Sequence, residues 1–289
     1  MIVVTTHNHL GDSAILTAAV YNVRMARPDI DIRYNGWAKE LWKNLSFTAV
    51  TDVPAHFSVG YGTLFDEQNS VFGNCVAGFT HDLCEKLQIP CVPLASGIPV
   101  LRLTEEEKAT GAFCRGKWII NANAQTCSCS KWYPHWQKVV DMLQGKVSFV
   151  QVGSTERKNI SRGLSGVLDY RGMSQDLRQF LSMIWNCDGI VSPPSGIMNL
   201  AAAFGKPQVI VNAAREAARL SDYPGVACVS CAYCGYNGLD NGCVTLLMPG
   251  SEKSHRRCTD PVMIDGIQTA ACMASIHPES IAEKIISRV

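Results

Sequence analysis

The order of apolar and polar segments is the feature that most limits the fold of this chain. An apolar run over residues 1–6 is followed by helical spacing of apolar side chains over 13–27 and by strand-like alternation over 29–34. After a polar, glycine-marked stretch at 104–116, the same order restarts and continues over 118–211. Strands that alternate with helices indicate mostly parallel sheets. The sequence therefore predicts two α/β units joined by a linker.

The other expected elements follow from the same periodicities. We expect further helices over 37–45, 76–87, 133–143, 177–185, 197–204 and 278–289, and strands over 100–103, 118–121, 147–152, 189–192 and 208–211. The segment 225–272 breaks this rhythm because it is rich in glycine and cysteine.

Composition and charge exclude several classes of protein. With 47% hydrophobic and 18% charged residues, the 289-residue chain can bury a large core and is not a disordered protein. Its 26 Lys and Arg nearly balance 25 Asp and Glu, which argues against a strongly basic nucleic-acid binder. No secretory signal is visible, and no stretch reaches the roughly 20 apolar residues that span a bilayer. We therefore expect a cytoplasmic protein without a transmembrane segment.

Thirteen cysteines are many for a cytoplasmic chain, where thiols stay reduced or bind metal. Cys231 and Cys234 have the two-residue spacing with which two thiolates hold one tetrahedral ion, and two later cysteines can complete the site for zinc or iron. A glycine-rich segment that lacks a hydrophobic pattern also needs a bound metal ion to stabilise its fold. The alternative is that a free cysteine is a common small buried residue. This is the role that we expect for Cys75, Cys84, Cys91 and Cys187.

Asp12 stands between the first expected strand and helix, at the carboxyl edge of a parallel sheet, where ligands of such folds bind. A carboxylate at this place can act as a general base toward a hydroxyl nucleophile. It can also merely cap the helix, because aspartate is a preferred N-cap residue. No Gly-x-Gly-x-x-Gly pattern follows the strand, so the sequence does not support a dinucleotide site.

Three turns at strand ends in the second half are suited to binding phosphate. Ser195 and Gly196 open a helix directly after a strand, where free backbone N–H groups and the positive helix end attract anions. Gly153 and Ser154 close another strand in the same way, and Lys131 lies at the entrance to a helix, where its ammonium can contact a phosphate. Ser195 can instead serve only as an N-cap, and Lys131 can simply be solvated. Together the three turns favour a phosphate or nucleotide site.

These motifs resemble those of glycosyltransferase family 9, the heptosyltransferase-like enzymes with the two-domain GT-B fold. The run Gly11–Thr17, followed by Arg27-Pro28, is similar to the family's opening motif, whose aspartate is the proposed base. Lys131–Trp136 resembles the family's lysine-tryptophan segment, whose lysine contacts the donor phosphates. The segment Ser195–Ala203 stands where the family usually has Asp-Ser-Gly-Pro-Met-His-Leu-Ala-Ala.

Two positions depart from that last motif. Pro194 replaces its aspartate and Asn199 replaces its histidine, which changes the side chains that can contact the donor. Backbone contacts from Ser195 and Gly196 would survive both replacements. We expect Asp12 to be the catalytic base. The expected donor-binding residues are Lys131, Gly153, Ser154, Ser195, Gly196 and Asn199.

A subset of this family, which includes protein-modifying autotransporter heptosyltransferases, carries a cysteine-bound iron in the second domain. Arg215-Glu216, Tyr223-Pro224, Cys258–Val262 and Cys272-Met273 resemble the pattern of that subset. The ion would be structural, iron or zinc, because the GT-B reaction does not itself need a metal. The resemblance implies as its ligands Cys231, Cys234, Cys258 and Cys272, with Cys243 in reserve.

The fold that the resemblance implies is α/β of the GT-B type, with two Rossmann-like domains facing a cleft. An acceptor-binding domain would cover 1–110, and a nucleotide-sugar-binding domain would cover 111–289, with the cysteine-rich metal-binding insertion 225–272 and the C-terminal helix. The implied activity is inverting transfer of a sugar, heptose or similar, from a nucleotide diphosphate sugar to an acceptor hydroxyl. A glycolipid, a protein hydroxyl and a hydroxylated nucleic-acid base remain open as acceptors. A homo-oligomer is one assembly that the sequence allows.

Two other functions stay open on the sequence. A catalytically degenerate binding or assembly protein would keep the GT-B fold and the metal knuckle, and the replacements Pro194 and Asn199 favour this hypothesis. It predicts that no nucleotide sugar binds. A thiol-based redox protein would require a cysteine with a perturbed pKa, and no neighbouring residue in the sequence indicates one.

Overall fold

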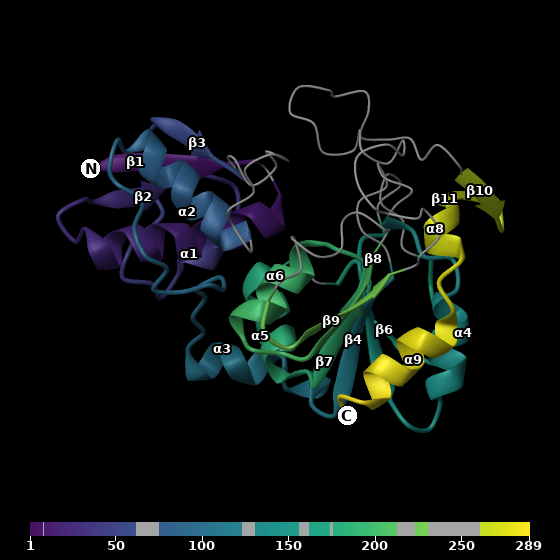
Figure 1. Ribbon diagram of the computed structural model, residues 1–289. Coiled ribbons are helices and arrows are strands. Elements are labelled where there is room, and N and C mark those ends of the chain that lie inside the picture. Colours follow the sequence, from purple (N-terminus) through teal and green to yellow (C-terminus); the bar gives the residue numbers. More distant parts are fainter. Residues whose placement is uncertain are drawn as a thin grey trace.

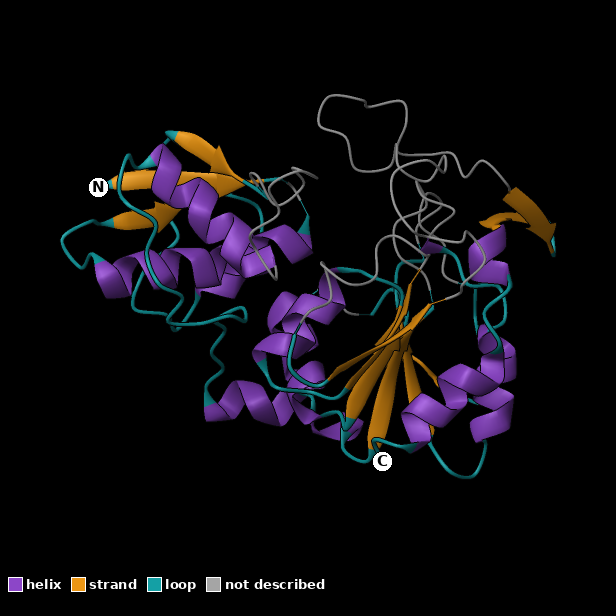
Figure 2. Cartoon of the chain, in the orientation of Figure 1, coloured by secondary structure: helices purple, strands orange, loops and turns teal. Residues whose placement is uncertain are grey.

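Two parallel sheets organise the chain (Figure 1, Figure 2). We call the elements around the smaller sheet the first lobe and those around the larger sheet the second lobe. The predicted α/β class with parallel sheets is confirmed. The computed structural model describes residues 1–7, 9–61, 75–122, 131–155, 162–173, 176–212, 223–230 and 261–289.

The first lobe is built on three parallel strands in the order β2-β1-β3. Its strands are β1 (Ile2–Thr6), β2 (Ile32–Tyr34) and β3 (Phe57–Val59), and its helices are α1 (Leu10–Ala26), the 3-10 turn Lys39–Trp42 and α2 (Cys75–Lys86). Twelve of the 17 residues of α1 are buried, because this helix packs on α2 and also on a helix of the second lobe, α6. Helix α1 is therefore part of the boundary between the lobes.

The second lobe is built on six parallel strands in the order β6-β5-β4-β7-β8-β9. These are β4 (Lys117–Asn121), β5 (Ser148–Val152), β6 (Leu168–Asp169), β7 (Gly189–Ser192), β8 (Gln208–Asn212) and β9 (Val226–Ser230). The helices are α4 (Trp136–Leu143), α5 (Leu177–Asn186), α6 (Gly196–Ala203), α8 (Ala271–Ala274) and α9 (Pro278–Ile286). A separate antiparallel hairpin joins β10 (Pro261–Ile264) to β11 (Ile267–Ala270).

Helices cover both faces of the larger sheet. Figure 1 shows α5 and α6 on the face toward the first lobe and α4 and α9 on the opposite face. Successive residues of a strand point to opposite faces, so the central strands supply two cores. The core shared with the first lobe receives Ile119, Ile190 and Ile210, and the core under α4 and α9 receives Ile120, Val191 and Val209.

Two predicted helices of the first lobe have wrong boundaries, and the helices predicted over 133–143 and 278–289 are each three residues shorter, at Trp136–Leu143 and Pro278–Ile286. Helix α1 begins at Leu10, three residues before the predicted start at 13. The helix predicted over 37–45 is reduced to the 3-10 turn Lys39–Trp42, because the backbone is extended at Lys43 and Asn44 takes a positive φ of 66°.

The strand predicted over 100–103 does not form. The N–H of Val100 donates to the hydroxyl of Thr17 at 2.9 Å, so this backbone pairs with a side chain of α1 instead of a strand. The segment 225–272, in contrast, contributes β9 to the parallel sheet, where it pairs with β8.

The stretch 104–116, predicted to be a linker, contains the short helix α3 (Glu105–Thr110) and the 3-10 turn Ala112–Cys114. Thr104 and Glu107 form a capping box at the start of α3. The Thr104 hydroxyl accepts the N–H of Glu107, and the Glu107 carboxylate accepts the N–H of Thr104. Such reciprocal bonds satisfy helix donors that would otherwise lack a partner.

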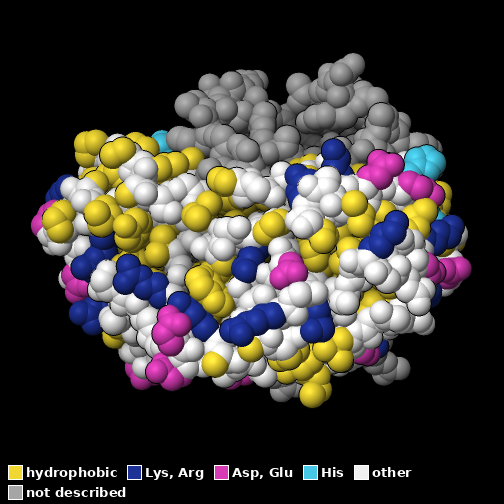
Figure 3. All heavy atoms as spheres, turned by 90° about the horizontal axis from the view of Figure 1, so that it is seen from below, with side chains coloured by type: hydrophobic (Ala, Val, Ile, Leu, Met, Phe, Trp, Pro, Cys, Tyr) yellow, Lys and Arg dark blue, Asp and Glu magenta, His cyan; other side chains and the backbone are white. Residues whose placement is uncertain are grey.

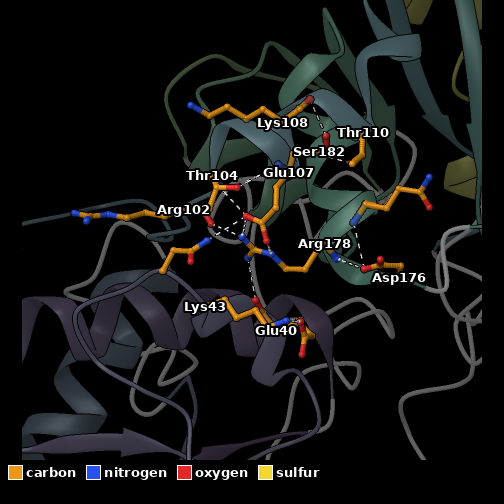
Figure 4. Close-up of polar contacts among 12 residues, drawn as sticks. Glu40, Lys43, Arg102, Thr104, Glu107, Lys108, Thr110, Asp176, Arg178 and Ser182 are labelled. Atoms are coloured by element: carbon orange, nitrogen blue, oxygen red, sulfur yellow. Dashed lines mark hydrogen bonds and ion pairs between the residues drawn. The ribbon is translucent and has the colours of Figure 1, made fainter.

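Arg178 of α5 ties the lobes together beside this helix (Figure 4). Its guanidinium donates to both carboxylate oxygens of Glu107, at 2.7 and 2.5 Å. It also donates to the carbonyl oxygen of Arg102 at 2.6 Å and to that of Glu40, in the first lobe, at 3.0 Å. The Arg178 side chain is only 8% exposed. One buried cation therefore joins the first lobe, α3 and the second lobe.

The surface of the described residues carries charges of both signs. On the face that Figure 3 shows from below, lysine and arginine side chains are interspersed with acidic and hydrophobic ones. This mixture agrees with the near balance of charge in the sequence. Within the described ranges, no helix has the length and apolar character that crossing a bilayer requires.

Candidate functional site

Asp12 lies in the first turn of α1, which follows the carboxyl end of β1. His9 is the N-cap residue and its side chain makes no capping hydrogen bond. Asp12 is therefore the third residue of the helix, and its interpretation as an N-cap is wrong. The residue is only 6% exposed. A buried carboxylate that does not cap its helix needs another explanation, although the positive helix end stabilises its charge.

The surroundings of Asp12 act on its charge in opposite directions. Burial raises the pKa of the carboxyl group, because desolvation disfavours the charged form. A hydrogen bond from the Tyr61 hydroxyl to Oδ1, 2.7 Å long, lowers the pKa, as do the charges of His9, His7 and Lys131. Among the described residues, none hydrogen-bonds the second oxygen, Oδ2. Asp12 thus has one oxygen that Tyr61 holds and one that no described residue hydrogen-bonds.

Helix α6 begins where β7 ends, at the carboxyl edge of the larger sheet. Ser195 is its N-cap residue in extended conformation, but its side chain does not cap the helix. Instead, the amide of Asn121, the last residue of neighbouring β4, lies 3.3 Å from the Ser195 hydroxyl. The first N–H groups of α6 are thus not capped by Ser195, and they form the kind of helix end that binds anions.

The first turns of α1 and α6 touch. A Cβ atom added to Gly11 would lie 2.7 Å from Nδ2 of Asn199 and 3.4 Å from Cα of Gly196. A Cβ atom added to Gly196 would lie 3.1 Å from the backbone nitrogen of Gly11. Two glycines therefore let two positive helix ends meet beside Asp12, which makes this junction favourable for an anion. We call the contact between these first turns the helix junction.

Asn199 connects the lobes across this junction. Its Oδ1 accepts a hydrogen bond of 2.7 Å from the hydroxyl of buried Tyr223, which precedes β9. Its Nδ2 fills the space over Gly11. The side chain predicted to contact a donor is thus already engaged in protein contacts in this structure.

The other predicted donor residues lie around the same sheet edge. Lys131 interacts electrostatically with Asp12 across the lobes. Gly153 and Ser154 follow β5, the strand next to β4, and the Gly153 carbonyl accepts the N–H of Gly172 at 2.9 Å. Gly153 has a φ of 139°, which favours glycine at this turn. The structure therefore brings Lys131 close to Asp12 and sets Gly153 and Ser154 at a neighbouring strand end.

Two tyrosines of this site were not predicted. Tyr61 follows β3 and Tyr223 precedes β9, and both are separated in sequence from their partners on α1 and α6. The dipeptide Tyr223-Pro224 was a signal, since it resembled the metal-bearing subset of the family, but it did not indicate a contact with Asn199. Nothing in the local pattern around Tyr61 singles that residue out.

Three buried thiols do not support redox chemistry. Burial raises the pKa of Cys75 and Cys187 to about 12 and that of Cys114 to about 11, which keeps them protonated and unreactive. Cys75, Cys84 and Cys187 are buried, as predicted. Cys91 is exposed, so its predicted burial is wrong.

Most of the predicted metal ligands lie outside the described residues. These are Cys231, Cys234 and Cys258, together with the reserve ligand Cys243. Cys272 is described and lies buried in α8, in the core under α4 and α9. Within the described ranges, no group of three or more His, Cys, Asp or Glu side chains is arranged to hold an ion. The metal site therefore stays a prediction.

The close contact at the helix junction predicts that Gly11→Ala lowers the stability of the protein. The added methyl group would meet the Asn199 amide at 2.7 Å, so we expect a loss of about 1–3 kcal/mol in the free energy of unfolding. Asn199→Ala removes the obstacle. In a double-mutant cycle measured by urea unfolding, the two changes together should cost less than their sum. Strict additivity would contradict the contact.

Two sequence comparisons found no match for the chain. No protein-family model matches it, and no curated protein matches its sequence.

Solved structures, in contrast, match the chain along nearly its whole length. The ADP-heptose LPS heptosyltransferase II of E. coli aligns with 100% of this chain and 98% of its own, at 14% identity and a TM-score of 0.64. A glycosyl transferase of family 9 from Veillonella parvula aligns with 99% and 96%, at 13% identity and a TM-score of 0.65. The iron-containing dodecameric glycosyltransferase TibC of enterotoxigenic E. coli aligns with 99% and 75%, at 12% identity and a TM-score of 0.61. The chain therefore has the GT-B-like fold of these heptosyltransferases.

Proposed function

We propose that this chain is an inverting glycosyltransferase that moves a sugar from a nucleotide diphosphate sugar to an acceptor hydroxyl. The observation that carries the proposal is the buried Asp12 carboxylate at the helix junction, beside the first turn of α6 and within electrostatic reach of Lys131. A base next to an anion-binding helix end is the pair of groups that this reaction needs. The heptosyltransferase-like fold supports the same conclusion.

The proposed step is a single displacement at the anomeric carbon. The acceptor oxygen forms a bond to that carbon while the bond from carbon to the diphosphate oxygen breaks. Asp12 takes the proton of the acceptor hydroxyl, and the nucleoside diphosphate leaves with the electron pair. Because the attack comes from the side opposite to the leaving group, the anomeric configuration inverts.

The leaving diphosphate gains negative charge during this step. In the proposal, Lys131 and the backbone N–H groups at Ser195 and Gly196 stabilise that charge, which preorganised donors do most effectively in a site shielded from water. Gly153 and Ser154 line the neighbouring strand end on the nucleotide side. Asn199 contributes by holding α6 against α1, in addition to any contact with the donor.

In the proposal, the two halves of the chain bind different substrates. Residues 1–110 would bind the acceptor, and residues 111–289 would bind the donor. Heptose is the proposed sugar because the similar structures include enzymes named for ADP-heptose. A glycolipid, a protein hydroxyl and a hydroxylated nucleic-acid base are the acceptor classes to screen, and a homo-oligomer is part of the proposal because TibC is dodecameric.

Calorimetric titration with a panel of nucleotide diphosphate sugars tests donor binding. We expect one donor to bind per chain and Lys131→Ala to weaken that binding, because the ammonium no longer faces the phosphates. Lys138→Ala, an exposed lysine on α4, serves as the matched control. If no nucleotide sugar of the panel binds, the proposal fails, and the degenerate binding or assembly protein becomes the better account.

We further propose that the cysteine set of the second lobe binds one structural ion, iron or zinc, as TibC is an iron-containing relative in fold. Elemental analysis of the purified chain should find one ion per chain. The pair Cys231→Ser and Cys234→Ser should remove the ion. Cys91→Ser, which changes an exposed thiol outside the set, should retain it. A wild-type chain without iron or zinc would contradict this proposal.

A further inference from the structure

Tyr61 makes the one side-chain hydrogen bond to Asp12 that the described residues provide. Its hydroxyl donates to Oδ1 at 2.7 Å, across 49 residues of sequence. A hydrogen bond to a charged acceptor is stronger than one between neutral groups, and it also fixes direction. Tyr61 therefore determines which oxygen of Asp12 is occupied.

Helix α2 holds the ring of Tyr61 in place. The ring stands edge-on against Phe79, with centroids 5.0 Å apart and an interplanar angle of 85°. Phe79 itself is fully buried. Rings that meet in this way attract one another beyond the area that they bury. The hydroxyl is thus presented by a ring with little freedom to turn away.

The backbone before Tyr61 is anchored to the same helix. The N–H of Gly60 donates to Oδ2 of Asp82 at 2.8 Å. The ammonium of Lys86 donates to that same carboxylate oxygen at 2.7 Å and to the carbonyl oxygen of Ser58 at 2.5 Å. Asp82 is only 8% exposed. Side chains and backbone together preorganise the position of the Tyr61 hydroxyl before any substrate binds.

Several titratable groups surround Asp12, and their effects can be separated. Burial raises its pKa, the Tyr61 hydrogen bond is the strongest opposing effect, and the nearby cations follow. Desolvation and the neighbouring Asp12 carboxylate raise the pKa of Tyr61 well above its usual value, so its hydroxyl stays a hydrogen-bond donor. The groups that face Asp12 from the surrounding elements are His7, His9, Tyr61, Cys75, Lys131 and Tyr223.

We propose that Tyr61 is a positioning residue of the transfer reaction: its hydroxyl holds Oδ1 of Asp12 and leaves Oδ2 to take the acceptor proton. This inference rests on the proposed function, since it assigns Tyr61 a role through Asp12. It goes beyond that function because it names a hydrogen-bond donor, in the loop after β3, that fixes the orientation of the Asp12 carboxylate and sets its basicity.

The variant Tyr61→Phe tests the proposal, because it removes only the hydroxyl. Loss of a hydrogen bond to a charged group is expected to lower turnover at neutral pH by about tenfold or more. Since the Tyr61 bond favours the carboxylate, its loss should raise the pKa of Asp12. The acidic limb of the pH profile of kcat/KM should therefore move to higher pH.

Tyr34→Phe is a matched control within the same lobe. The Tyr34 hydroxyl is also buried and contacts Ser13, the residue after Asp12, at 3.4 Å. Removing it should leave the acidic limb in place. An unshifted limb in Tyr61→Phe, or an equal shift in both variants, would overturn the proposal.

A direct titration separates this inference from the proposed function. The carboxyl carbon of Asp12 is followed by NMR in protein labelled at aspartate, with Asp12→Asn for assignment. Tyr61→Phe should raise the pH midpoint of the Asp12 titration and Tyr34→Phe should not, even if the protein consumes no nucleotide sugar. Lys86 is half-exposed, and Lys86→Met removes its hydrogen bond to the backbone before Tyr61. This variant should raise the midpoint as well, but by less than Tyr61→Phe. Unchanged midpoints in Tyr61→Phe and Lys86→Met would overturn the proposal.

Discussion

Replacing Asp12 with asparagine is expected to lower transferase turnover by about 10²–10⁴-fold, the range over which general bases contribute. The amide has the same shape and can still accept the Tyr61 hydrogen bond at its oxygen, but it cannot take a proton from the acceptor. Affinity for the donor should stay nearly unchanged, because Asp12 lies on the acceptor side of the proposed reaction. Steady-state kinetics with a donor titration measure both quantities.

A second carboxylate provides the control for this substitution. Asp188 lies at the opposite edge of the larger sheet, before β7, where it accepts the N–H of Gly116 at 3.2 Å. Asp188→Asn should leave turnover unchanged. If Asp12→Asn and Asp188→Asn have equal turnover, Asp12 is not the base.

Arg178→Met is expected to cause the largest loss of stability, about 3–5 kcal/mol, because it leaves a partly buried carboxylate without its cation. Glu107 would lose both guanidinium bonds, and the carbonyl groups of Arg102 and Glu40 would each lose a donor. Urea unfolding measures the change. Adding Glu107→Gln should recover part of the loss, since the unpaired charge is then removed.

An exposed ion pair of similar geometry is the control for Arg178. Arg27 donates to both carboxylate oxygens of Asp29, at 2.9 and 2.7 Å, but the two side chains are 43% and 61% exposed. Exposed pairs contribute little to stability. Arg27→Met should therefore be nearly neutral. Equal losses in Arg27→Met and Arg178→Met would show that Arg178 does not join the lobes as described.

The ion pair between Arg178 and Glu107 also makes the stability of the protein depend on pH. The Arg178 guanidinium lowers the pKa of Glu107 to about 2, from a usual value of 4.5. A depressed carboxyl pKa contributes stability above 4.5 that is lost as the pH falls toward 2. The free energy of unfolding of Glu107→Gln should therefore fall less steeply over this range than that of the wild type.

The periodic parts of the fold could be predicted from sequence. The helix Leu177–Asn186 repeats its apolar residues with the helical period, and the strand Gly189–Ser192 is a short, continuous buried run. The bounds of both agree with prediction within a residue or two. Segments whose backbone pairs with distant side chains were predicted wrongly. Val100 bonds to Thr17, 83 residues away, and no local pattern carries that information.

The residues of the candidate site also fall into those that could be predicted from the sequence and those that could not. Asp12, Ser195 and Gly196 could be found because they stand at strand ends, where parallel sheets place ligands. Tyr61 reaches Asp12 over 49 residues, and Arg178 reaches Glu107 over 71. Contacts of this kind depend on how elements that are distant in sequence pack against one another, which the local sequence does not specify. The engagement of Asn199 by Tyr223 belongs to the same class.

Release of nucleoside diphosphate tests the central claim most directly. The wild-type chain and Asp12→Asn are incubated with a panel of nucleotide diphosphate sugars and candidate acceptors, and the products are identified by mass spectrometry. The account predicts that the wild type consumes one donor, releases its nucleoside diphosphate and yields a glycosylated acceptor, while Asp12→Asn retains the donor unreacted. A wild-type chain that neither retains nor consumes any donor of the panel would contradict it.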